Sequence, residues 1–311
     1  LNALLASEVM RYEVIENELV EIKEKYADER RTRIIKMATE FNPEDMYADD
    51  DMVITISHLG YIKRTPLADF RQQGRGGVGA KASAARDEDF IEYVHQANMH
   101  STMMFFTEQG RLYWTKVYEL PEGNRQSKGR ALQNMINIQK GDKVCAFIHV
   151  KNLNDMEYVQ NHYLIFATKD GLMKKTTLES YSRPRANGII ALGLREGDRL
   201  IRVTLTDGNS QMLVASYNGK VVRFPEDTVR PMGRTATGVR AIKLDEDGQD
   251  RVIGMICVEE GSKESVLVIS EKGFGKRTDL DDENGEPIYR ITNRGGKGVK
   301  TMNLTDKTGN L

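Results

Sequence analysis

The sequence predicts an all-β protein of about five propeller-like blades, the last of them incomplete, preceded by an α-helical segment. Five times along the 311 residues an apolar run meets a turn containing glycine and leaves through a second run, at intervals of 48–61 residues. Repeats of this length with strand-rich content are typical of propeller blades. The turn glycines are Gly60, Gly110, Gly171, Gly219 and Gly273.

A second recurring feature supports the repeat. Each hairpin is followed, after a polar connection, by a short segment that contains glycine. A single hairpin cannot cover its own apolar face, so the blades must stack on one another and the array is the unit of stability. These glycine segments are residues 77–82, 127–132, 186–191, 236–241 and 296–301.

The first forty residues have a different pattern. Apolar residues recur at spacings of three and four from Leu5 to Tyr26, which predicts an amphipathic helix. We expect a helical tail over residues 1–40, an acidic linker over 41–51 that includes Asn42-Pro43, and the β domain over 52–311. The helical pattern starts without an initiator Met or a cap, and the fifth repeat stops soon after its glycine segment. We therefore expect a piece of a longer protein.

Composition excludes several classes of protein. No run approaches 18 apolar residues and no signal peptide is visible, so we expect a soluble cytoplasmic protein without a membrane partner. Cys145 and Cys257, the only cysteines, lie in strand-like runs and are expected to be buried reduced thiols.

Charge is divided unevenly, although the net charge is −1. Residues 1–51 hold 7 of the 45 Lys and Arg and 14 of the 46 Asp and Glu, which leaves 38 and 32 for residues 52–311. Basic residues recur at the hairpin ends and in the connections after them, and equivalent positions in a ring of blades form a rim. Such a rim favours contact with phosphates rather than reading of bases. For each single side chain, the alternative is an ordinary solvated strand end.

The sequence thus provides two groups of candidate rim residues. At the hairpin ends they are Lys63, Arg64, Lys174, Lys175, Arg223, Lys276 and Arg277. In the connections and glycine segments they are Arg71, Lys81, Arg125, Lys128, Arg130, Arg183, Arg185, Arg230, Arg234, Arg240, Arg294, Lys297 and Lys300.

Catalytic chemistry finds no support in the sequence. The five histidines show no metal-ligand spacing, two cysteines cannot build a zinc site, and neither a nucleophile elbow nor a Walker lysine loop is present. Residues 74–79 satisfy the G-x-G-x-x-G pattern. However, the dinucleotide fingerprint needs a strand before it and a helix after it, and this context is missing. We expect no catalytic, metal or cofactor site in the chain.

Together with their neighbours, the same glycines form a longer motif that is more specific than the G-x-G-x-x-G pattern. Gln73-Gly74-Arg75-Gly76-Gly77-Val78-Gly79 resembles the gyrase A box, a Gln-basic-Arg-Gly-Gly-basic-Gly heptapeptide in the C-terminal domain of the A subunit of bacterial DNA gyrase. The resemblance covers nearly the whole chain, because segments 57–70, 116–130, 219–244 and 273–280 also resemble that family and occur in family order.

The resemblance implies a β-pinwheel of four-stranded blades whose basic rim wraps duplex DNA, so that an ATP-dependent type II topoisomerase introduces negative supercoils. It implies that the partners are duplex DNA, the B subunit of gyrase, plus a second copy of the A subunit in an A2B2 holoenzyme. The catalytic tyrosine lies upstream in the family. ATP and Mg²⁺ belong to other domains of the holoenzyme, and the helical head is similar to the end of the coiled-coil arm.

Two departures from the box concern its charge. Gly74 and Val78 stand where the family usually has Lys or Arg, so Arg75 alone keeps a charge within the motif. The alternative for these glycines is a loop that serves only turn geometry. At the level of function, the alternatives are the A subunit of topoisomerase IV, which decatenates and wraps weakly, and a propeller used as a protein-interaction scaffold.

Overall fold

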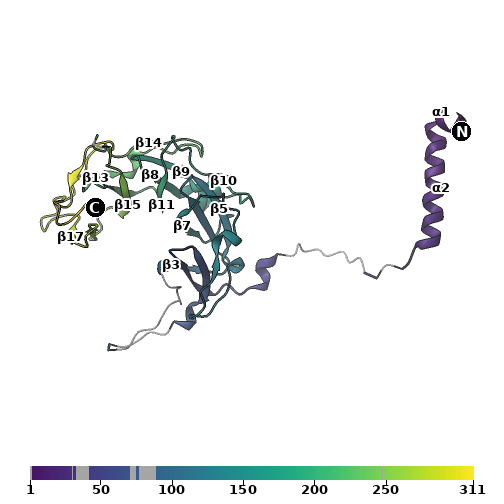
Figure 1. Ribbon diagram of the computed structural model, residues 1–311, viewed down its shortest axis with the longest axis horizontal. Helices are drawn as coiled ribbons and strands as arrows, with labels where there is room; N and C mark the ends of the chain where they lie inside the picture. The colour runs from purple at the N-terminus through teal and green to yellow at the C-terminus, as the bar shows by residue number, and fades with distance from the viewer. Residues whose placement is uncertain (1, 30, 33–41, 71–74, 77–88, 247) are drawn as a thin grey trace. The chain divides into compact units, whose positions relative to one another are not determined.

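The structure is a computed structural model that describes residues 2–29, 31–32, 42–70, 75–76, 89–246 and 248–311 (Figure 1). The chain forms two compact units, Leu1–Pro43 and Glu44–Leu311. The strands of the described chain all belong to the second unit.

The first unit contains helices α1 (Asn2–Ala6) and α2 (Glu8–Tyr26). The side chain of Ser7 caps α2 by accepting a hydrogen bond from the Met10 amide at 3.4 Å, as expected at a helix N-terminus. The apolar residues of the predicted stripe, such as Tyr12 and Leu19, are exposed. No helix in the described ranges is long and apolar enough to cross a membrane.

Four antiparallel four-stranded sheets and a two-stranded fifth sheet form the second unit, and they follow one another along an arc (Figure 1). The predicted fold class is confirmed. We call each sheet a blade and give its strands in sheet order. Blade 1 is β3 (Ile91–Asn98), β1 (Asp51–Ser57), β2 (Tyr61–Pro66) and β6 (Arg130–Ala131), and blade 2 is β7 (Val144–Val150), β4 (Thr102–Thr107), β5 (Arg111–Lys116) and β10 (Ile189–Ile190).

The remaining blades follow the same order from the inner to the outer strand. Blade 3 is β11 (Leu200–Thr206), β8 (Tyr163–Thr168), β9 (Leu172–Thr177) and β14 (Val239–Arg240), and blade 4 is β15 (Val252–Glu259), β12 (Ser210–Ser216), β13 (Lys220–Pro225) and β18 (Val299–Lys300). Blade 5 contains β16 (Ser265–Ile269) and β17 (Gly275–Asp279).

The fourth strand of each complete blade comes from the following repeat. The glycine segment of repeat 2 supplies β6 to blade 1, where Arg130 pairs with Ile62. In the same way, the glycine segment of repeat 4 supplies β14 to blade 3, where Val239 pairs with Met173. Adjacent blades are therefore linked by a strand exchange, and these two-residue strands form the outer edges of the sheets.

The glycine of each segment that supplies an outer strand is needed because this strand approaches its neighbour closely. Gly238 has φ +97°, and a Cβ atom there would lie 2.4 Å from the main-chain oxygen of Met173. Gly129 has φ +77°, and its Cβ would lie 2.5 Å from the oxygen of Ile62. Only glycine combines a positive φ with the absence of that atom. The recurring glycine segment in the sequence is thus explained by strand exchange.

Gly238→Ala is expected to lower the free energy of unfolding by about 3 kcal/mol, because the new methyl group adds a steric overlap to the strain of positive φ. Gly197→Ala is the matched control: Gly197 has φ +81°, and no atom lies within 4 Å of the place that its Cβ would take. It should cost only about 1 kcal/mol. Urea unfolding of both variants measures the difference, and equal losses would contradict a close approach at Gly238.

The hydrophobic core is divided among the interfaces between successive blades. One cluster joins blades 1 and 2 around Phe105, and another joins blades 2 and 3 around Phe106 and Phe166, whose rings meet edge to face at 5.6 Å. Further clusters join blades 3 and 4 and blades 4 and 5. Strand β11 contacts both β7 and β15, so these strands lie on the inner side of the arc (Figure 1).

Short helices follow the hairpins and fill the connections between strands. Most are single 3-10 turns placed directly after the second strand of a hairpin. They are η1 (Pro43–Met46), η2 (Leu67–Asp69), η3 (Val117–Glu119), η4 (Leu132–Asn134), η5 (Leu178–Tyr181), η6 (Glu226–Thr228) and the α-helix α3 (Met156–Asn161).

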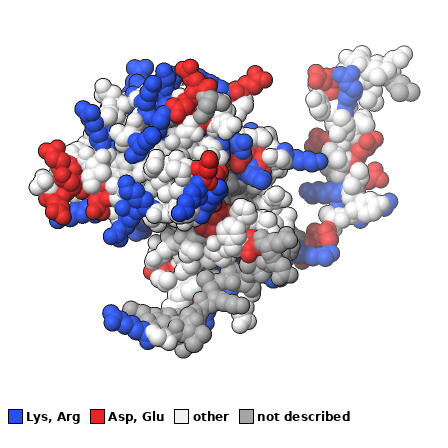
Figure 2. Space-filling model, turned by 60° about the vertical axis from the view of Figure 1, so that its left-hand side comes forward, with Lys and Arg blue, Asp and Glu red and all other residues white. Residues whose placement is uncertain are grey.

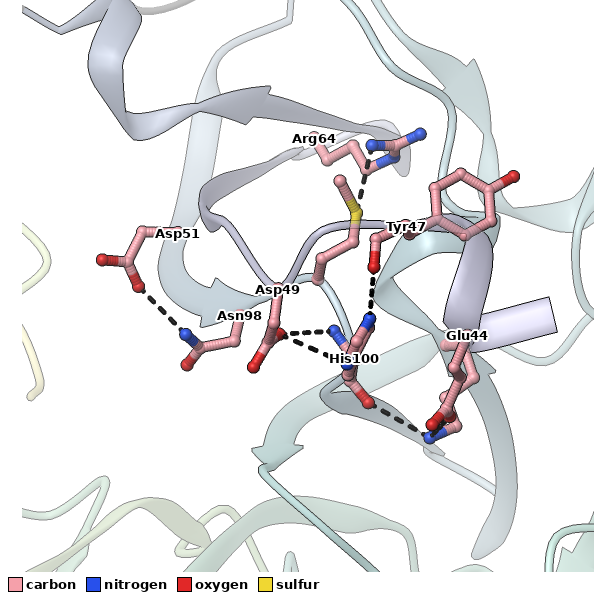
Figure 3. Close-up of polar contacts among 9 residues, drawn as sticks. Glu44, Tyr47, Asp49, Asp51, Arg64, Asn98 and His100 are labelled. Carbon is pink, nitrogen blue, oxygen red and sulfur yellow. Dashed lines mark hydrogen bonds and ion pairs between the residues drawn. The ribbon is translucent and has the colours of Figure 1, made fainter. Parts of the chain in front are cut away.

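The segment from Glu44 to Asp51 is fixed to blades 1 and 2 (Figure 3). The ring of His100 contacts the main-chain oxygen of Tyr47 at 2.8 Å, and its amide donates to Asp49 at 3.0 Å. Glu44 forms an ion pair with Lys116, and the ring of Tyr47 stacks on Tyr118 at 5.0 Å. These contacts make this stretch part of the β unit.

Candidate nucleic-acid interface

Basic side chains project from the outer strands of three blades. Arg130 on β6, Arg240 on β14 and Lys300 on β18 are all exposed. On β10 the residue equivalent to Arg240 and Lys300 is the exposed Ile190, opposite Arg111 of β5. Figure 2 shows separate Lys and Arg side chains projecting over one face of the β unit, with Asp and Glu at its left-hand edge and also among the basic side chains at the top. Exposed basic side chains therefore lie on the outer strands of blades 1, 3 and 4.

The loops that lead into the outer strands add further basic residues. Arg294 connects two blades, because its guanidinium donates to the main-chain oxygens of Thr228 at 3.1 Å and Arg240 at 3.4 Å. Arg125 and Arg234 are half-buried. The remaining candidates of these loops are exposed, namely Lys128, Arg183, Arg185, Arg230, Arg294 and Lys297.

Three arginines meet at a hollow beside blade 3. Arg183 and Arg185 come from the loop of repeat 3 and Arg234 from the loop of repeat 4, 49 residues beyond Arg185. The hollow has a volume of about 480 Å³, and Ser180, Ser182, Glu179 and Met156 complete its lining. Arginine is the side chain that most often binds phosphate, and this lining brings three arginines together beside one acid, Glu179. The two serines were not predicted, since no sequence pattern marks them.

The expectation that the hairpin ends contribute to the rim is wrong for five residues. Lys63, Arg64, Lys174, Lys175 and Arg223 are all buried. They cannot reach a ligand outside the protein, and they are not solvated strand ends either. The following repeat supplies hydrogen-bond acceptors to each of them. Further acceptors come from the residue's own repeat, namely Ala191 for Lys174 and Gln211 for Arg223.

Lys63 and Lys174 occupy equivalent positions, three residues after the turn glycine, and bind main-chain carbonyls. The ammonium of Lys63 donates to the oxygens of Asn124, Arg125 and Ser127 at 2.8, 3.3 and 3.0 Å. The ammonium of Lys174 donates to the oxygens of Ala191 and Arg234, both at 2.5 Å. Burial lowers the pKa of Lys63, and burial together with the nearby Arg234 charge lowers that of Lys174 to about 7.

The next residue of each hairpin points to the opposite face of the sheet and binds an acid. Lys175 lies 2.7 Å from the buried carboxylate of Glu226, which also accepts from the hydroxyl of Thr206 at 2.7 Å. Arg64 pairs with Glu122 at 3.2 Å. Arg223 pairs with Asp281 at 3.0 Å and donates to Gln211 at 2.7 Å. These ion pairs connect elements that lie far apart in the sequence.

Lys276 and Arg277 occupy the equivalent positions in the fifth hairpin but are exposed. The reason is that, within the described residues, no outer strand pairs with β17. Lys276 and Arg277 thus differ from the buried basic residues at the equivalent positions of blades 1, 3 and 4.

The heptapeptide box is described only in part. Arg75 and Gly76 are exposed, and Gly76 has φ +84°. The other predicted residues of this region lie outside the described residues, namely Arg71, Gln73, Gly74, Gly77, Val78, Gly79 and Lys81.

The two cysteines of the chain pack against the core. Cys145 and Cys257 are free and pack partly buried against the core, and burial raises the pKa of each thiol to about 12. In the part of the chain that the structure describes, no group of three or more His, Cys, Asp or Glu residues is placed to hold a metal ion.

Comparison with known proteins gives a consistent family. The family model described as "DNA gyrase C-terminal domain, beta-propeller" matches residues 51–98, 101–151, 162–207, 211–259 and 264–311. The chain is 41% identical over 312 residues to the A subunit of DNA gyrase from Staphylococcus epidermidis (strain ATCC 12228 / FDA PCI 1200) and 40% identical to that of Staphylococcus aureus (strain NCTC 8325 / PS 47). These alignments cover 100% of this chain and 34% of each relative, so the chain spans about a third of their length.

Solved structures share the fold. The C-terminal domain of DNA topoisomerase IV superposes with a TM-score of 0.67 at 25% identity, over 85% of this chain and 76% of that chain. The DNA gyrase A C-terminal domain superposes with a TM-score of 0.62 at 22% identity, over 84% of this chain and 80% of that chain.

Proposed function

Because the chain belongs to the DNA gyrase C-terminal domain family, we propose that its β unit binds duplex DNA along the outer edge of the blades and wraps it. The observation that carries this proposal is the placement of the basic side chains. Those on the outer strands of blades 1, 3 and 4 and most of those in the loops before the outer strands are exposed, while Lys63, Lys174 and Lys175 are buried. The exposed candidates thus lie on the outer strands and on the loops that lead into them.

The interface contacts phosphates and does not read bases. Arginine and lysine on short strands and loops neutralise phosphates, whereas sequence reading in the major groove needs a helix or a two-stranded ribbon that enters it. Bending 20–30 bp smoothly costs about 1–6 kcal/mol, so contacts on several blades must act together to hold a wrapped duplex. The hollow formed by Arg183, Arg185 and Arg234 is the densest of these contacts.

The box completes the path of the DNA in this proposal. Arg75 is exposed and is the only charged residue of the heptapeptide Gln73–Gly79. We assign it a phosphate contact beside blade 1, flanked by Arg71 and Lys81. The glycines around it allow main-chain amides to approach a phosphate.

At the level of the whole enzyme, wrapping supplies a DNA crossing of fixed handedness. We propose that the chain works within an ATP-dependent type II topoisomerase of the bacterial cytoplasm, together with the B subunit of gyrase plus a second copy of the A subunit. In this proposal cleavage and ATP hydrolysis are carried out by parts of the enzyme other than this chain.

The fold by itself fits both gyrase and topoisomerase IV. Sequence favours gyrase, because the relatives that are 40–41% identical over the whole chain are gyrase A subunits. The scaffold alternative predicts exposed aromatic patches, whereas the outer strands and their loops carry arginine and lysine.

The chain is expected to bind duplex DNA with a steep salt dependence and little sequence preference. If six or more phosphates are contacted, raising the salt from about 50 to 200 mM should weaken binding by about a thousandfold. Fluorescence anisotropy with two labelled duplexes of different sequence measures both properties. Affinity that is insensitive to salt, or a strong preference for one duplex, would contradict the proposal.

A further inference from the structure

Lys63 and Lys174 are buried in an unusual way for lysine. Their ammonium groups contact main-chain oxygens, and Lys174 also lies 3.3 Å from the hydroxyl of Tyr181 and 4.8 Å from the centre of the Phe166 ring. No carboxylate is among the described partners of either lysine. Burying an ammonium without a counter-ion opposes folding, so packing alone does not explain these residues.

The equivalent positions in other blades show that the fold does not need a charge here. Blade 2 has Tyr113 and blade 4 has Val222, and both are buried against the glycine of the following outer strand. An uncharged side chain therefore fills the same space. The ammonium groups of the lysines in blades 1 and 3 must therefore have a role other than filling this space.

What they provide is control of the loop above them. Lys63 holds the main-chain oxygen of Arg125, and Lys174 holds that of Arg234. In each case the bound oxygen belongs to a basic residue of the loop that leads into the outer strand. The carbonyl is held inward, and this fixes the backbone from which the arginine side chain extends. For Arg234 that side chain lines the hollow with Arg183 and Arg185.

We propose that Lys63 and Lys174 are positioning residues for the DNA-binding arginines, holding Arg125 and Arg234 from beneath through their main-chain oxygens. This inference rests on the proposed function and adds a form of regulation to it. Neither lysine touches the DNA. Each orders a loop before the DNA arrives, which reduces the entropy lost on binding.

The protonation state of Lys174 gives the proposal a specific consequence. Its charged form has three N–H donors for three acceptors, namely the oxygens of Ala191 and Arg234 and the hydroxyl of Tyr181. The neutral amine has only two. The titratable groups that face it are Tyr181 and Arg234, while Lys175 and Glu226 lie on the other face of the sheet. As pH rises through about 7, the ammonium loses its proton and the loop loses one of its bonds.

The test compares Lys174→Met with the wild type, using a labelled duplex at about pH 6 and at about pH 8.5. At about pH 6 the variant should bind DNA about fivefold more weakly than the wild type, and at about pH 8.5 the two should bind equally. The fall in wild-type affinity from the lower to the higher pH should therefore exceed that of the variant by about fivefold. Melting temperatures of both proteins at each pH show whether the fold is intact. If the methionine variant unfolds, Lys174→Val copies the residue that blade 4 carries as Val222.

A double-mutant cycle with Arg234→Ala identifies the route of the effect. In the Arg234→Ala background, Lys174→Met should change DNA affinity by less than twofold, because the side chain it positions is gone. An undiminished effect in that background would overturn the proposal. So would a Lys174→Met protein with wild-type affinity and wild-type pH dependence. If the wild type does not bind duplex DNA, the proposed function is wrong. If the wild type binds and Lys174→Met leaves that binding unchanged, only the positioning role of Lys174 is wrong.

Discussion

Glu226→Ala is expected to lower the free energy of unfolding by about 3–5 kcal/mol, because it leaves the buried ammonium of Lys175 without its partner. Glu226 is 1% exposed and accepts bonds from Lys175 at 2.7 Å, Thr206 at 2.7 Å and the Ser210 amide at 3.2 Å. Without it, the remaining described neighbour of the Lys175 ammonium is the ring of Tyr163, 4.2 Å away. Calorimetry should show a fall in melting temperature of about 10 °C.

Two variants separate the ion pair from general effects of mutation. Asp227→Ala removes the neighbouring acid, which is exposed, and should change stability by less than about 0.5 kcal/mol. Glu226→Gln keeps a hydrogen-bond acceptor but removes the negative charge. The fall in its free energy of unfolding should therefore lie between those of Glu226→Ala and Asp227→Ala. A Glu226→Ala protein that melts within a degree or two of the Asp227→Ala protein would contradict a structural role for this pair.

Replacing Arg183, Arg185 and Arg234 together with alanine is expected to weaken duplex binding by about a hundredfold at low salt and to reduce the slope of log K against log salt by about 3. The three side chains line one hollow, so their loss removes one cluster of phosphate contacts. Anisotropy titrations at a series of salt concentrations measure both quantities.

The matched control removes the same charge elsewhere. Arg195, Arg199 and Arg202 are exposed. Arg202 lies in β11, on the inner side of the arc, and the other two precede this strand, with Arg199 in an ion pair with Glu108 at 3.6 Å. Alanine at these three positions should change the slope by less than about 1. Equal losses in the two triple variants would mean that binding follows net charge, and the outer-edge interface would be wrong. Circular dichroism on both proteins verifies that each remains folded.

Much of the fold could be predicted because it is encoded locally. Alternating apolar runs on either side of a turn glycine predict a hairpin, and the period at which these hairpins recur predicts stacked blades. The partner of each glycine segment could not be predicted in this way. Pairing of Arg130 with Ile62 joins residues 68 positions apart, and no local pattern distinguishes this partner from the segment's own hairpin.

The candidate site was predicted less well for a related reason. A lysine at the end of a hairpin usually reaches water, so Lys63 and Lys174 were expected on the rim. Their burial depends on carbonyl groups of residues about sixty positions later in the chain, whose direction a sequence does not reveal. Arg185 and Arg234 are 49 residues apart, and no local pattern predicts that they line one hollow. Exposed loop residues such as Lys128 and Arg183 were identified because charge, glycine and lack of apolar pattern occur together there.

Strand exchange also determines how a blade could be gained or lost in evolution. The strands of one sheet are discontinuous along the gene, because the outer strand is encoded within the next repeat. A deletion that follows the spatial boundary of a blade would therefore need two separate cuts. A single deletion of one complete sequence period removes a hairpin together with the outer strand of the preceding blade. The next glycine segment can then pair with that hairpin, so duplication or loss of one internal period leaves the four-stranded sheets around it complete.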